Sequence, residues 1–215
     1  MTTLISDNPK ITFAAIKLQD VWEEQKSYID HGSVGDSPHP DFIDIITHKE
    51  AVLKHYQPVF SPDRINGLTK AEFESFLLYR NNHHWDSLHR VGAYMVEDMP
   101  LLRKCLAILL DESRPVRDRI NEIRPERYWG EHSMVSHLGT PVLTAILHVV
   151  FPEKYGVWNN TSDAGLKEVR LWDQRWEKEK AGNSYFEMNR IYLQLSTAVG
   201  VDLWTLDALW WLIKK

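Results

Sequence analysis

The sequence predicts an all-α fold, a bundle of about nine to eleven helices. Apolar residues recur three and four positions apart along most of the chain, which is the period of an amphipathic helix. Capping residues bound several of these stretches: Thr69 lies three residues before Glu72, and Gly200 follows the apolar stretch that ends at Val199. No segment alternates apolar and polar residues convincingly, as a half-buried strand would.

Length and composition predict a folded protein. The chain has 215 residues, and we expect a single helical domain over 1–215, with 1–60 as a candidate N-terminal annex and 68–215 as the core. Its 43% hydrophobic and 11% aromatic content, with nine Trp, excludes a chain that is mainly disordered.

Charge and cysteine usage narrow the function classes. A formal net charge of −5 excludes the strongly basic surface of nonspecific nucleic-acid binders but leaves room for a local basic patch. The single cysteine, Cys105, cannot form an internal disulfide, which favours a reducing compartment and a cytoplasmic protein. The first residues lack a secretory leader and no apolar run reaches the length of a membrane span, so we expect a soluble, unprocessed protein with no membrane partner.

The first sixty residues predict two helices joined by a loop. Apolar spacing predicts a helix over 9–29, Gly and Pro residues in 31–40 predict the loop, and Asp41 suits the cap of the second helix. On that helix Asp44 and His48 lie four residues apart, which suits either a surface ion pair or two metal ligands. No third ligand stands at a compatible spacing, so the sequence favours the ion pair and predicts no metal and no cofactor.

The helix predicted to begin after Thr69 leads into a polar and aromatic segment, 80–90. As a helix this segment would have one polar face, made of Asn82, Asp86, His89 and Arg90. Amide, imidazole and guanidinium groups beside a tryptophan edge suit a phosphate group and a planar base. The candidate ligand-binding residues are Asn82, His84, Trp85, His89 and Arg90. Alternatively, Trp85 and Leu88 belong to the core and the polar side chains cap or are solvated. The histidines here lack zinc spacing.

An apolar helix is predicted to begin at Asp98, and Ser113 is predicted to cap the next one. Five arginines against three acidic residues follow between Ser113 and Gly130; they are Arg114, Arg117, Arg119, Arg124 and Arg127. This window could bind phosphate groups, and a solvated face with ion pairs explains it equally well.

The segment 136–161 carries the clearest signs of a site. A short helix that ends near Leu138 would meet Gly139, which can adopt the left-handed backbone of a sharp turn. Thr140 and Pro141 suit the N-cap and the first position of a new helix. Apolar residues cover most of that helix, which predicts that it is buried at the centre of the domain.

An aromatic, amide-rich loop follows this helix. Trp158, Asn159 and Asn160 offer a stacking surface and amides that can bind the edge of a base, including an extruded one. Thr161 or Ser162 is predicted to cap the next helix.

This order of helix, glycine turn, helix and loop resembles the helix-hairpin-helix unit of the DNA glycosylase superfamily. The resemblance rests on Leu138, Gly139, Thr144 and Ala145. It implies that backbone groups near Gly139 and Thr140 bind a phosphate group. The second glycine, the catalytic aspartate and the lysine nucleophile of that family have no counterpart at the matching positions, so the resemblance implies binding rather than catalysis.

A looser resemblance covers the segments 73–90 and 139–159. Their patterns, Phe-x-x-Phe-Leu … Asn-x-His-Trp … His-Arg and Gly … Thr-Ala … Val-Trp-Asn, are similar to helical modules found beside restriction and ATPase domains. This resemblance implies nucleic-acid sensing.

The C-terminal part predicts further helices. Ser184 and Glu187 form a second capping box, Gly200 ends that helix, and Asp202 caps the last one. Asp207 is a carboxylate among tryptophans, so we expect it to be either exposed or held by a buried partner such as an arginine, and it is a candidate orienting group for a ligand.

These features favour a noncatalytic module that binds DNA or recognises a modified base. Its predicted DNA contacts are Gly139, Thr140, Trp158, Asn159, Asn160, Arg114, Arg117 and Arg124. One alternative is a glycosylase-like enzyme in which Asp207 or Asp163 supplies the missing carboxylate. The other is a helical adaptor whose surface tryptophans dock a partner protein.

Overall fold

The computed structural model describes residues 8–30, 39–124 and 133–214, and every regular element within these ranges is a helix. The α-helices are α1 (Pro9–Asp30), α2 (Pro40–Val59), α3 (Lys70–Leu77), α4 (Tyr79–Asn82), α5 (Gly92–Met95), α6 (Met99–Leu110), α7 (Val116–Ile123), α8 (Thr140–Val150), α9 (Asn160–Glu168), α10 (Ala181–Val199) and α11 (Leu203–Ile213). Three short 3-10 helices are η2 (Ile65–Gly67), η3 (Asp86–Val91) and η4 (Gln174–Glu177). The predicted all-α class is confirmed.

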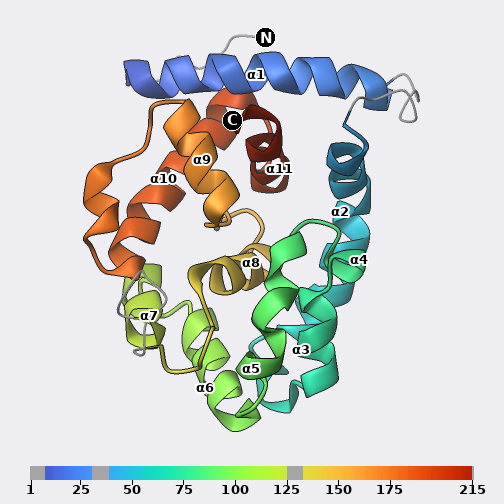
Figure 1. Ribbon diagram of the computed structural model, residues 1–215, viewed down its shortest axis with the longest axis vertical. Coiled ribbons are helices and arrows are strands. Elements are labelled where there is room, and N and C mark those ends of the chain that lie inside the picture. Colours follow the sequence, from blue (N-terminus) through green and yellow to red (C-terminus); the bar gives the residue numbers. More distant parts are fainter. Residues whose placement is uncertain (1–7, 31–38, 125–132, 215) are drawn as a thin grey trace.

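Helix α8 lies at the centre of the molecule, with the other helices around it (Figure 1). Every residue from Val142 to Val149 is buried, as the apolar sequence of this helix predicts, and α2 and α6 pack against it. Helix α1 lies across the ends of α10 and α11 and contacts both (Figure 1). One cluster of buried side chains extends from Ile11 to Trp210, so α1 and α2 share their core with the later helices. No helix in the described ranges is both long and apolar enough to cross a membrane.

Four helix ends agree with the predicted capping signals. Thr69 and Glu72 form the expected reciprocal capping box at α3. Asp98 and Asp202 accept hydrogen bonds from backbone N–H groups in the first turns of α6 and α11. Gly200 ends α10 in the left-handed conformation, with φ of 77°. Each signal lies within three residues of the group that it satisfies, which is why local sequence suffices.

Two predicted caps are wrong. Ser113 does not cap α7; it hydrogen-bonds to Asp111, and α7 begins at Val116. Ser184 lies inside α10, where its hydroxyl donates to the carbonyl of Trp176. Helix α10 begins earlier because a residue from another helix satisfies its first turn: Asn121 of α7 accepts a hydrogen bond from the N–H of Gly182 at 2.8 Å. The predicted Asp41 cap is also absent, since α2 begins at Pro40.

The turn before α8 differs from the predicted hairpin. Residues 133–138 form turns and bends and not a helix, and Gly139 is extended, with φ of −87° and ψ of 170°. The left-handed residue is His137, with φ of 63°, whose carbonyl accepts the N–H of Gly139. Gly139 is therefore the N-cap of α8, and Thr140 and Pro141 are its first two residues. The helix-hairpin-helix element is not confirmed.

Candidate functional site

A cleft of about 730 Å³ opens where the N-terminal ends of α8 and α9 meet the segment around η3. It brings together two stretches that the sequence singled out separately. The predicted site residues that line it are His84, Trp85, Arg90, Arg124, Gly139, Thr140, Trp158, Asn159 and Asn160. The remaining ones, Asn82, His89, Arg114, Arg117 and Asp207, lie outside its lining.

The first turn of α8 leaves one backbone N–H group, that of Thr140, without an acceptor among the described residues, because Pro141 has no N–H and those of Gly139 and Val142 donate to the carbonyls of His137 and Gly139. Gly139, the N-cap residue, has no side chain that can accept from the backbone N–H groups of the first turn. Such a helix end carries partial positive charge and attracts anions. The cleft is also lined by three cationic side chains, Arg90, Arg124 and Lys167, and by three carboxylates, Asp86, Asp163 and Glu177. The three positive and three negative side-chain charges cancel. The partial positive charge at the start of α8 therefore remains as a net attraction for an anion.

The aromatic loop after α8 contributes mainly structure. Trp158 is only 2% exposed, and its indole N–H donates to Asp163 at 2.8 Å. The side chain of Asn159 caps α9 by accepting from the backbone N–H groups of Thr161 and Ser162. The predicted cap at Thr161 or Ser162 is therefore displaced to Asn159. Asn160 is exposed and is the loop amide that faces solvent.

Trp211 is a cleft residue that the sequence analysis did not single out. It is 42% exposed, and Lys214 Nζ lies 3.5 Å from the centre of its ring. A signal was present in the sequence: Trp210 and Trp211 are adjacent on a helix, so one of them must turn away when the other enters the core. Trp210 is the buried one, at 1% exposure.

The arginines predicted as one cluster lie in three different environments: two in ion pairs at the surface, one in the core and one at the cleft wall. Arg114 lies just before α7 and Arg117 lies on it, and they pair with Glu122 and Asp118, respectively. Arg119 is buried and donates to the carbonyl of Leu109 and to the hydroxyl of Tyr155. Arg124 reaches the cleft wall but is itself only 5% exposed. Arg127 lies outside the described residues.

The polar helical face predicted for residues 80–90 is wrong. Helix α4 ends at Asn82, His83 adopts a left-handed backbone with φ of 51°, and η3 begins only at Asp86. The side chain of Asn82 is fully buried and holds this turn, since it donates to the carbonyl of Phe76 and accepts from the N–H groups of His84 and Trp85. Asn82 therefore has a structural role.

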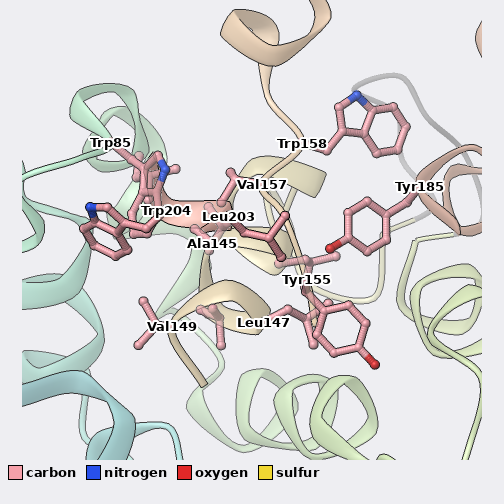
Figure 2. Close-up of a cluster of buried hydrophobic side chains, with 14 of the residues drawn as sticks. Trp85, Ala145, Leu147, Val149, Tyr155, Val157, Trp158, Tyr185, Leu203 and Trp204 are labelled. Atoms are coloured by element: carbon pink, nitrogen blue, oxygen red, sulfur yellow. The ribbon is translucent and has the colours of Figure 1, made fainter. Parts of the chain in front are cut away.

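Asp207 is held by buried partners, but they are not arginines. The same carboxylate oxygen accepts from the indole N–H of Trp85 at 2.9 Å and lies 3.0 Å from Nε2 of His84. The ring of His84 stacks on that of Trp85. Figure 2 shows Trp85 and Trp204 side by side and apart from Trp158. The tryptophan of the segment 80–90 and that of the loop after α8 therefore belong to different parts of the core.

His148 of α8 belongs to the same buried region. Its ring stacks on Trp204, and its Nδ1 lies 2.6 Å from the carbonyl oxygen of Tyr155. Burial disfavours the charged imidazolium and lowers the pKa of His148 to about 4, although the carbonyl of Tyr155 and the carboxylate of Asp207 act in the opposite direction. His148 is therefore neutral at physiological pH.

One group of side chains in the described ranges has the composition and spacing of a metal site. The predicted Asp44–His48 ion pair is present at 3.0 Å, and His83 joins it with its Nδ1 3.0 Å from the other oxygen of Asp44. The three side chains lie outside the cleft lining.

Comparison of the chain with protein-family models, with curated proteins and with solved structures finds no significant match. The resemblances drawn from the sequence therefore stay predictions.

Proposed function

We propose that the chain is a noncatalytic DNA-binding module that takes a phosphate group of a DNA strand in the cleft at the start of α8. The observation that carries the proposal is the N-terminus of this helix, where the N–H of Thr140 has no acceptor among the described residues and which opens into a cleft lined by Arg90 and Arg124. Backbone N–H groups at a helix end, together with guanidinium groups, are a common arrangement for binding phosphate.

The same cleft offers a surface for a base. Trp211 is partly exposed and can stack on any base without reading its sequence. Asn160, the first residue of α9, supplies an exposed amide to the same cleft. Trp158 and Asn159 already hold Asp163 and the first turn of α9, so we assign the base contact to Trp211 and Asn160 instead.

Titration of fluorescein-labelled single-stranded and duplex oligonucleotides at low salt, followed by fluorescence anisotropy, tests the proposal. Trp211→Ala should weaken binding by about 1–3 kcal/mol, the usual cost of losing a base-stacking contact. Arg90→Ala should weaken it and reduce the slope of log affinity against log salt by about 1, as expected for one lost phosphate contact.

Arg117→Ala is the matched control. Arg117 is an exposed arginine on α7 that lies outside the cleft lining, so its removal changes the net charge by the same amount as Arg90→Ala. Binding should be unaffected. Absence of binding to every oligonucleotide, or equal losses in the two arginine variants, contradicts the proposal. A loss in Arg117→Ala alone moves the contact to the arginine-rich helix that the sequence suggested.

A different observation favours the glycosylase-like alternative. His84 lines the cleft, its Nε2 lies 3.0 Å from Asp207, and neither of its buried ring nitrogens makes a hydrogen bond with good geometry among the described residues. A histidine oriented by a carboxylate is a common general base. Under this alternative, DNA containing uracil or alkylated bases should yield alkali-sensitive sites, and Asp207→Asn should abolish them. Unchanged DNA in both samples removes the alternative.

The adaptor alternative rests on exposed tryptophans. In the described ranges Trp211 is the one tryptophan among the large exposed apolar side chains. It lies in the cleft, so it serves the DNA proposal equally well.

A further inference from the structure

Two separate parts of the chain meet at a cluster of three metal-ligating side chains. Asp44 and His48 lie one turn apart on α2, and His83 follows α4. Asp44 joins the two imidazoles: its Oδ1 lies 3.0 Å from Nδ1 of His48, and its Oδ2 lies 3.0 Å from Nδ1 of His83. The three ligand atoms all lie within 4.8 Å of one another, and the two rings are parallel, with centroids 3.9 Å apart.

The local structure holds His83 in this position. A left-handed backbone is unfavourable for a residue with a side chain, so it persists only where surrounding contacts enforce it. Here the fully buried amide of Asn82 fixes the turn on one side of His83, and Asp44 accepts from its imidazole. The turn therefore presents the imidazole of His83 to α2.

The distances between the ligand atoms suit a small transition-metal ion. Bonds from Zn²⁺ to imidazole nitrogen and to carboxylate oxygen are about 2.0–2.2 Å, which separates two ligands of a tetrahedral site by about 3.4 Å. The two 3.0 Å contacts involve different oxygens of Asp44, and one ligand atom from each side chain lies within 4.8 Å of the others, so the ligand atoms need to approach one another by at most about 1.4 Å. His83 shares a proton between its Nδ1 and Asp44, and Nδ1 of His48 also lies 3.0 Å from the backbone carbonyl oxygen of Asp44; a bound ion would take the place of both contacts.

The ligand types select the class of ion. Two imidazoles and one carboxylate favour zinc and its neighbours among the divalent transition metals, whereas Mg²⁺ and Ca²⁺ prefer oxygen ligands throughout. The side chains of His48, Asp44 and His83 are 42%, 35% and 27% exposed, so an ion has access and water can complete its coordination. Three protein ligands and a water are the usual arrangement of an open zinc site.

The surroundings favour a cation. The hydroxyl of Tyr79 lies 3.5 Å from Oδ2 of Asp44 and can orient that carboxylate. The carboxylates of Asp41 and Asp86 also act electrostatically on Tyr79 from nearby. Two acidic side chains beyond the ligands therefore add negative potential at this point of the surface.

We propose that Asp44, His48 and His83 form a binding site for one divalent transition-metal ion of the zinc class. The site lies apart from the cleft and does not depend on the proposed DNA binding.

Isothermal titration of ZnSO₄ into the full chain, prepared without an affinity tag, tests this site. One ion should bind per chain, and the thermal unfolding midpoint should rise with added Zn²⁺ because only the folded chain brings the three ligands together. Loss of an outer-shell partner weakens metal binding by about 10–100-fold. His48→Asn and His83→Asn remove direct ligands and should each weaken it at least as much, and Tyr79→Phe should weaken it by no more than about 100-fold.

His55→Asn is the matched control, because His55 is an exposed histidine on the same helix and lies outside the cluster. It should bind Zn²⁺ as the wild type does. A readout that needs no variant is the NMR spectrum of the imidazoles, in which Zn²⁺ should shift the signals of His48 and His83 and leave those of His55 unchanged. Equal affinity in the wild type and in the folded His48→Asn/His83→Asn double variant, or no bound ion in the wild type, overturns the proposal.

Discussion

His83 and His84 are neighbours in the chain, and each lies 3.0 Å from an aspartate, yet their surroundings are opposite. His83 faces Asp44 and His48 at the surface, where water can exchange with the side chains. His84 is fully buried between Trp85 and Trp204 and faces Asp207. The left-handed backbone at His83 turns the two side chains to opposite sides.

A histidine and an aspartate in contact therefore have different roles at the surface and in the core. An exposed pair contributes little to stability, because water solvates both partners nearly as well when they are apart. A buried pair becomes part of the fold, because a polar group left without a partner in the core is costly. We therefore expect substitution of the buried Asp207 to reduce the stability of the fold, and substitution of the exposed Asp44 to leave it nearly unchanged.

Asp207→Ala should have the largest effect on stability. It leaves the indole N–H of Trp85 without its acceptor and removes the carboxylate that lies 3.0 Å from Nε2 of His84 inside the core. We expect a loss of about 2–4 kcal/mol in the free energy of unfolding, since each unpaired buried group costs about 1–3 kcal/mol. Urea denaturation followed by tryptophan fluorescence measures it. A loss below 1 kcal/mol would show that the buried pair contributes no more than an exposed one.

The pH dependence of stability should reveal the second buried histidine. The folded pKa of His148, about 4, is below its unfolded value of about 6.5, so the unfolded chain binds the proton more readily at intermediate pH. Stability is therefore unaffected by this group above pH 6.5, falls as the pH is lowered towards 4, and changes no further below that. The accumulated loss is about 3 kcal/mol.

Urea denaturation of the wild type and of His148→Gln at several pH values from 7 to 4 isolates this contribution. The difference between their free energies of unfolding should shrink as the pH falls, because the variant has no imidazole to protonate. A difference that stays constant over the whole range contradicts a buried, neutral His148.

Asp44→Asn should have the smallest effect. The carboxylate is 35% exposed, and exposed ion pairs typically contribute about 0–1 kcal/mol. Urea denaturation without added metal should therefore give a free energy of unfolding within about 1 kcal/mol of the wild-type value. A loss as large as that of Asp207→Ala would mean that the cluster at α2 is part of the core and would remove the contrast between the two histidines.

The two regions also differ in how far the sequence revealed them. The Asp44–His48 pair was visible because both residues lie on one helix at a spacing of four. Its third member was not visible, since His83 is 39 positions from Asp44 and reaches it through a left-handed turn. Asp207 was recognised as a carboxylate that needs a partner, but Trp85 lies 122 positions away.

The cleft is likewise formed by segments that are distant in the chain. Its two walls were each recognised, as the segment around His84 and Arg90 and as the segment around Gly139 and Asn160, but nothing in their sequences indicated that they meet. The helical face expected for 80–90 failed because the amide of Asn82 competes with the backbone hydrogen bonds that would continue the helix.

Local residue patterns predict the helical class, the burial of α8 and the helix ends marked by Thr69, Asp98, Gly200 and Asp202. These features depend on periodicity and on hydrogen bonds between residues a few positions apart. The packing of the helices determines which histidine is buried, which tryptophan of the 210–211 pair lines the cleft, and that His83 completes a cluster with Asp44. Such pairings depend on distances between helices, and no local pattern of residues encodes those distances.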